Sequence, residues 1–213
     1  MYGTSAVSVT SLEYPPVAIQ KNDYDYNTTT ISGQPYGNGT YYYGAYNDGS
    51  GTFQYGENGF NGRNLFDKLN DGTPYTYYES NTGYYLADTG VPDRIYIGQV
   101  NISSVTYTGD YIHISLPYPI ILTSYSFSFV STTTNTPYNW VLGGTNDNDF
   151  SSNLVLIDQQ NAQTPTPGTT VTYTTNSIVP YQSFCVSLTC AKPNPGASGY
   201  TVIDIGEWRL FGF

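Results

Sequence analysis

The sequence predicts an all-β fold, and three observations support this prediction. Apolar and polar residues alternate in several short segments, turn-forming residues separate these segments, and no window of about 12 residues has a clear helical apolar period. The chain has 213 residues, of which 22 are glycine and 13 are proline. This length suffices to bury about 70% of the unfolded surface, so one β domain is expected to be stable without disulfide or metal staples.

The first expected element is an extended N-terminal arm over residues 1–26. Consecutive prolines, Pro15 and Pro16, make this segment a weak folding unit by itself. The β domain is expected over residues 27–213, because no internal repeat and no sign of a second domain occurs there.

The clearest strands lie in the middle of the chain. Ile112 and Ile114 alternate with polar residues, and so do Phe127 and Phe129, which gives each strand one apolar face. The prolines in Leu-Pro-Tyr-Pro at 116–119 lack an N–H group, so we expect strand pairing to stop there. Further strands are expected at 154–159, 184–190 and 201–213.

A tryptophan-containing strand follows, and its apolar side chains are expected in the core. Trp140 and Leu142 point to the same face of this strand. Gly143 and Gly144 come next and are expected to let the backbone turn sharply. The residues expected to form the core are Trp140, Leu142, Phe127, Phe129, Ile112 and Ile114.

The charge distribution excludes two classes of partner. The chain has 16 acidic and 6 basic residues, and its formal net charge is −10. The basic residues are scattered, whereas nucleic acids and anionic membranes require clustered cations. No segment is long and apolar enough to insert into a membrane. Cys185 and Cys190 are expected on opposite faces of one strand, which favours reduced thiols.

Tyrosine is unusually abundant, with 24 residues. A tyrosine can bury its ring while its hydroxyl group forms a hydrogen bond, which suits both protein interfaces and sugar faces. Tyrosine also favours strands in general. Both interpretations remain open from the sequence.

Four motifs occur in an order that resembles the discoidin or coagulation factor F5/8 type C family. They are YGNGTY with the later loop NLFDKLNDG, then GDYIHISLPYPIILTSYSF, NTPYNWVLGGTNDNDF and the closing segment IGEWRLFGF. The resemblance implies a jelly-roll β-sandwich of the galactose-binding-like type for nearly the whole chain.

The resemblance also implies one structural Ca²⁺ ion. Family members bind it through backbone carbonyls and an Asp of the loop that matches NLFDKLND, and through a Glu of the closing strand. Here these ligands correspond to the side chains of Asp67 and Glu207 and to the carbonyls of Asn64 and Leu69. Two alternatives stay open. Either Asp67 caps its own loop while Glu207 is solvated, or the ammonium group of Lys68 takes the place of the ion.

No pattern predicts a catalytic site, so we expect that the protein is not an enzyme. The single histidine, His113, lies within a strand, where we expect a surface residue. No nucleophile elbow, acidic pair, phosphate-binding glycine loop or zinc-type Cys/His spacing occurs. No residue matches the sugar-binding motifs of the family, but the loop tyrosines suit stacking on sugars.

Two functions follow from these observations. The forms GNGTY and LPYPIILTSY are similar to versions found in structural proteins of large double-stranded DNA viruses. The N-terminus has no signal-peptide pattern, which fits a virion protein made in a host cytoplasm. We therefore expect a non-enzymatic minor capsid protein that docks to other capsid proteins through its Tyr-rich loops and its arm. The alternative is an extracellular, lectin-like module that binds glycans.

Overall fold

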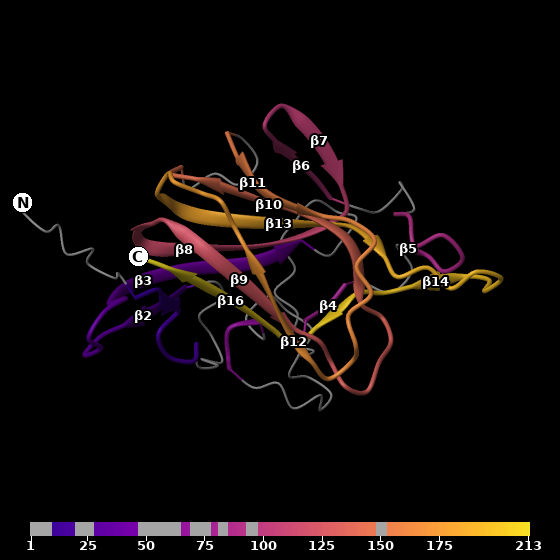
Figure 1. The fold of residues 1–213 in the computed structure, drawn as a ribbon, viewed down its shortest axis with the longest axis horizontal. Coiled ribbons are helices and arrows are strands. Elements are labelled where there is room, and N and C mark those ends of the chain that lie inside the picture. Colours follow the sequence, from indigo (N-terminus) through magenta and orange to yellow (C-terminus); the bar gives the residue numbers. More distant parts are fainter. Residues whose placement is uncertain are drawn as a thin grey trace, which may run out of the picture.

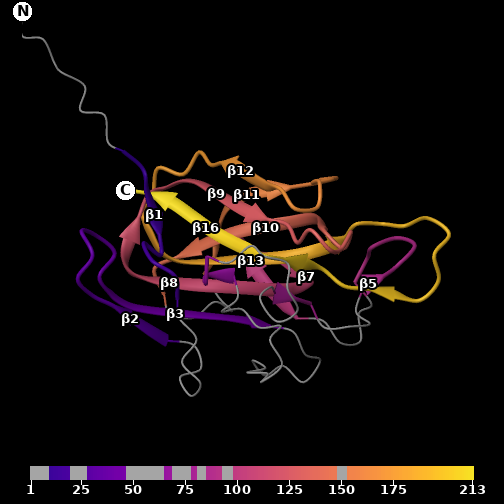
Figure 2. The ribbon, with the colours of Figure 1, turned by 90° about the horizontal axis from the view of Figure 1, so that it is seen from below.

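Two antiparallel β-sheets face each other and form a sandwich, as Figures 1 and 2 show. The computed structural model describes residues 10–19, 28–46, 65–68, 78–80, 85–92, 98–147 and 153–213. These residues contain many strands and no α-helix, so the all-β prediction is confirmed. No helix within these ranges has the length and apolarity that a membrane crossing requires.

The two large sheets have four and six strands. The smaller sheet has the order β1 (Leu12–Tyr14), β16 (Glu207–Gly212), β9 (Leu122–Ser128) and β12 (Thr170–Thr174). The larger sheet has the order β11 (Val155–Gln160), β10 (Pro137–Thr145), β13 (Tyr181–Ala191), β8 (Asp110–Ile120), β3 (Gly39–Tyr46) and β2 (Thr28–Ile31).

Three short strand pairs are attached to the sandwich. They are β14 (Tyr200–Thr201) with β5 (Tyr85–Leu86), β15 (Asp204–Ile205) with β4 (Tyr78–Glu79), and β6 (Gln99–Ile102) with β7 (Val105–Thr108). The β6–β7 hairpin contributes Val100 and Ile102 to a small apolar cluster that also includes Val141, Leu154 and Cys185.

The main core lies between the two large sheets and is rich in aromatic rings. All six residues expected in the core are 0% exposed. The buried indole of Trp140 keeps a hydrogen bond, because its Nε1 donates to the hydroxyl of Tyr125 at 2.9 Å. That hydroxyl in turn donates to Asp158 at 2.7 Å. Period-two alternation therefore placed these side chains on the correct face, and the one polar atom among the six, Nε1 of Trp140, is paired.

Part of the expected N-terminal arm belongs to the sandwich. Strand β1 pairs antiparallel with β16, and its Tyr14 lies opposite Leu210. Tyr14 and Ile19 are each 2% exposed and belong to the core. Residues 10–19 thus pack on the domain that was expected to begin at residue 27, with a strand at 12–14 and a bend at 15–17. Deleting residues 1–25 would remove an edge strand and two core side chains.

One of two predictions about the backbone is confirmed and the other is wrong. Strand β8 extends to Ile120, but residues 116–119 have no partner in the registers with β13 or β3, so pairing is interrupted at the prolines as expected. Gln182 Nε2 instead donates to the Leu116 carbonyl at 2.9 Å. Gly143 and Gly144 lie inside β10 and not in a turn. A Cβ atom at Gly144 would come within 2.8 Å of the Tyr181 ring, so close packing requires this glycine.

Candidate functional site

An open pocket lies at the end of the sandwich where β5 pairs with β14. Both views place this strand pair far from the C-terminus (Figures 1 and 2). The pocket has a volume of about 510 Å³, which is within the usual size range of small-ligand sites. Its lining includes Ala87, Asn135, Lys192, Asn194, Ser198 and Tyr200.

Backbone hydrogen bonds tie together the three segments that form the pocket. The N–H of Lys192 donates to the carbonyl of Thr136 at 2.9 Å, and the N–H of Asn194 donates to the carbonyl of Ala87 at 2.9 Å. The N–H of Ala87 donates to the carbonyl of Gly199 at 3.0 Å. These bonds fix the lining residues relative to one another, although most of these residues lie outside regular strands.

The polar side chains of the pocket divide into two groups. Asn135 is engaged within the protein, because its amide donates to Asp204 at 3.1 Å and accepts from the Thr201 hydroxyl at 3.4 Å. Among the described residues, none bonds to the side chains of Lys192, Asn194 or Ser198. An ammonium group, an amide and a hydroxyl group are therefore available to a ligand.

One side of the pocket has an exposed apolar rim. Tyr200 is 56% exposed and lies directly opposite Leu86 of β5. Val91 is also exposed and sits beside Leu86, whose N–H donates to the Val91 carbonyl at 2.9 Å. An exposed aromatic ring next to a polar pocket is the usual arrangement for a ligand that has one apolar face.

Behind the pocket, several polar groups are completely buried. The hydroxyl of Tyr85 donates to the Leu188 carbonyl at 2.7 Å and accepts from the N–H of Asp110 at 3.0 Å. Burial raises the pKa of Asp110 to about 8, against the opposing effect of the Ser80 hydroxyl. Asp110 and Asp204 are 0% and 1% exposed, so neither carboxyl group faces an open cleft.

The histidine is buried, which corrects the expectation of a surface residue. His113 is 6% exposed and lies opposite Cys185 in the pairing of β8 with β13. Burial lowers the pKa of His113 to about 3, so the imidazole is neutral at physiological pH. Cys185 and Cys190 are buried free thiols. None of these three residues lines the pocket.

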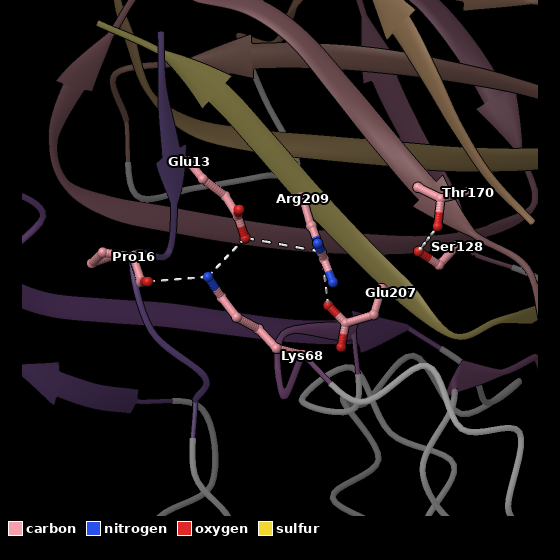
Figure 3. Close-up of polar contacts among 7 residues, drawn as sticks. All are labelled: Glu13, Pro16, Lys68, Ser128, Thr170, Glu207 and Arg209. Atoms are coloured by element: carbon pink, nitrogen blue, oxygen red, sulfur yellow. Dashed lines mark hydrogen bonds and ion pairs between the residues drawn. The ribbon is translucent and has the colours of Figure 1, made fainter. Parts of the chain in front are cut away.

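The residues expected to bind calcium lie in a different region. Asn64 and Leu69 fall outside the described residues. Glu207 is 1% exposed, and its carboxylate lies 3.6 Å from Nε of Arg209 (Figure 3). Asp67 is half-buried in the short described segment 65–68.

Lys68 and Arg209 form ion pairs with Glu13 and Glu207 in this region. Lys68 Nζ lies 2.7 Å from Glu13 and donates to the carbonyl of Pro16 at 3.1 Å (Figure 3). Within the described part of the chain, no three Asp, Glu, His or Cys side chains lie close enough together to hold a metal ion. The expected calcium site has only two such side chains, and its two carbonyls belong to Asn64 and Leu69 outside the described residues, so it stays a prediction. We refer to Glu13, Lys68, Glu207 and Arg209 as the charged network.

The sequence interpretation missed the pocket because its residues come from separate turns. Lys192 and Tyr200 are the first and last residues of the segment KPNPGASGY, whose turn-forming residues predict only a connector between strands. The available signal was a basic residue and an aromatic residue within one long loop, since loops on a rigid scaffold often carry binding residues.

Several solved structures that share this fold are carbohydrate-binding modules or lectins. The family 32 carbohydrate-binding module from Streptococcus pneumoniae EndoD has a TM-score of 0.52 at 10% identity, covering 80% of this chain and 96% of that module. A family 32 module from Clostridium perfringens, in complex with GalNAc-β-1,3-galactose, has a TM-score of 0.50 at 12% identity, covering 81% and 95%. A fucolectin from Morone saxatilis has a TM-score of 0.50 at 10% identity, covering 81% and 47%.

These identities establish the fold and nothing finer. The chain has the galactose-binding-like β-sandwich fold of the carbohydrate-binding modules, which confirms the expected fold class. No family model and no curated protein matches the sequence. The three structures named above are not virion components, so they give no support to the expected role in a capsid.

Proposed function

We propose that the protein binds carbohydrate in the pocket beside β5 and β14. One observation carries this proposal: the exposed ring of Tyr200 stands next to available amide, hydroxyl and ammonium groups. A sugar has C–H faces that pack against an aromatic ring and hydroxyl groups that form hydrogen bonds, so both parts of the pocket match it. The carbohydrate-binding modules of similar fold support the same proposal.

Each part of the pocket has a separate role in binding. The ring of Tyr200 covers one face of the sugar, and the side chains of Asn194 and Ser198 bond to its hydroxyl groups. The backbone bonds from Asn194 to Ala87 and from Ala87 to Gly199 hold the loop before the ligand arrives. A pocket held in this way loses less conformational entropy on binding.

The test is a comparison of two tyrosine variants. Glycan-array screening and calorimetry would first identify the sugar that binds the unaltered chain. Tyr200→Ala should then weaken binding by about tenfold or more, because the stacking surface is lost. Tyr42→Ala is the matched control, since Tyr42 is 50% exposed on β3 and does not line the pocket.

Two outcomes would overturn the proposed function. The first is the absence of any saturable glycan binding by the unaltered chain. The second is an affinity of the Tyr200→Ala variant that equals that of the Tyr42→Ala variant while both melt like the unaltered protein.

A further inference from the structure

The basic residues of this chain are few, and their placement in the fold is uneven. The structure describes three of the six lysine and arginine residues: Lys68, Lys192 and Arg209. Lys68 and Arg209 both belong to the charged network, where Glu13 and Glu207 offset their charge. Lys192 is the one described cation with no carboxylate partner among the described residues, and it lines the pocket.

We propose that the pocket prefers glycans with an anionic substituent, a carboxylate or a sulfate, which pairs with Lys192. This inference rests on the proposed function and specifies its ligand. None of the described residues that line the pocket is acidic, so none of these residues repels a negatively charged group. Asp204 is buried at 1% exposure and bonded to the Asn135 amide, which separates its carboxylate from the pocket.

The position of the lysine is held by its neighbours. The N–H of Ala191 donates to the carbonyl of Gly90 at 2.9 Å, and that of Lys192 donates to the carbonyl of Thr136 at 2.9 Å. Pro193 follows directly and restricts the backbone. Lys192 is half-buried and lines the pocket, so part of its side chain is confined by the protein.

The net charge of −10 opposes anion binding only at long range. Salt at about 0.15 M screens charges that lie more than about 8 Å apart, so the ammonium group at contact distance dominates the local field. The partly buried site strengthens that contact compared with an exposed ion pair. A preference for acidic glycans should therefore exist at physiological salt and shrink at about 1 M salt.

The experiment compares neutral glycans with acidic counterparts that share the same sugar core. An array would carry neutral oligosaccharides with their sialylated, uronate-containing and sulfated forms, and calorimetry would give affinities for each matched pair. The unaltered chain should bind an acidic form about tenfold more tightly, which is about 1.4 kcal/mol. Lys192→Met should bring the ratio close to one, whereas Lys192→Arg should retain most of it. The carboxylate and sulfate arms of the array show which anion is preferred.

The outcomes separate this inference from the proposed function. Equal binding of neutral and acidic forms by the unaltered chain would overturn the anionic preference and leave carbohydrate binding intact. A preference that survives in Lys192→Met would also overturn it. If no glycan of either kind bound, both proposals would fail. Thermal melts of each variant exclude unfolding as the cause of a lost signal.

Discussion

Replacing Asp110 with asparagine should change how the stability of the protein depends on pH. Asp110 begins β8, is 0% exposed, and has a pKa raised to about 8 by burial. In the unfolded chain the pKa of an aspartate is about 3.9. The folded protein therefore holds a proton on Asp110 through neutral pH, whereas the unfolded chain releases it.

The sign and the size follow from proton linkage. Below about pH 4 Asp110 is protonated in both states, so its ionisation does not lower the free energy of unfolding. As the pH rises from about 4 to about 8, only the unfolded chain releases the proton, and the free energy of unfolding declines until the folded form also ionises. Each pH unit inside this window costs about 1.4 kcal/mol for one proton. At pH 7 the accumulated cost is on the order of 4 kcal/mol, a large part of the usual 5–15 kcal/mol of a folded domain.

Asp110→Asn removes this cost because an amide does not ionise. The free energy of unfolding of Asp110→Asn, minus that of the unaltered protein, should rise between about pH 5 and pH 8 and then level off. Urea unfolding at several pH values measures this difference. Asp88→Asn is the control, because Asp88 is exposed and surface substitutions usually change stability by less than about 0.5 kcal/mol. A difference for Asp110→Asn that is the same at pH 5 and pH 8 would refute the reasoning.

Three further predictions concern stability. Lys68→Met removes the ion pair with Glu13 and the hydrogen bond to the Pro16 carbonyl. Because the side chains of Lys68 and Glu13 are about one quarter exposed, the free energy of unfolding measured in urea should fall by only about 1 kcal/mol. In the unaltered protein, Ca²⁺ and a chelator should give the same melting temperature, since Lys68 and Arg209 already supply positive charge; a lower melting temperature in chelator would instead support a calcium site. Gly109→Ala should cost at least about 2 kcal/mol in urea unfolding, because the added Cβ atom would clash with the Leu188 carbonyl oxygen. In Gly196→Ala the added Cβ atom meets nothing within 4 Å, but Gly196 has a φ of +88°, so the expected loss is the backbone strain of about 1–2 kcal/mol alone. A loss in Gly109→Ala that is no larger than the loss in Gly196→Ala would contradict the packing argument.

The buried faces of single strands could be predicted from the sequence, whereas contacts between segments that are distant in the sequence could not. Alternation identified the buried faces of β8 and β9 because a strand exposes successive side chains to opposite sides, whatever its partners are. The pairing of β1 with β16 joins the two ends of the chain, so no local pattern could place Tyr14 in the core. Gly144 shows the same limit, since its closeness to Tyr181 depends on a neighbouring strand.

The pocket was even harder to predict from the sequence, because it forms where separate segments of the chain pack together. Lys192, Ala87 and Asn135 come from three separate segments, and only the backbone bonds between these segments bring them to one pocket. Basic and aromatic residues in loops are common, so their presence alone does not indicate where a ligand binds. The calcium ligands could be named only through the family resemblance, and they stay a prediction because Asn64 and Leu69 lie outside the described residues.

The proposed glycan binding and the predicted pH dependence of stability involve the same end of the sandwich but different side chains. Thr201 of β14 lies opposite Tyr85, whose hydroxyl accepts from the N–H of Asp110, so the buried polar groups directly support the strand that carries Tyr200. Ionisation of Asp110 above about pH 8 should therefore weaken this support and reduce glycan affinity together with stability. Tyr200 and Lys192 stand outside the buried groups, so their replacement should reduce affinity alone. A loss of binding at high pH that persists in Asp110→Asn would have to come from another group.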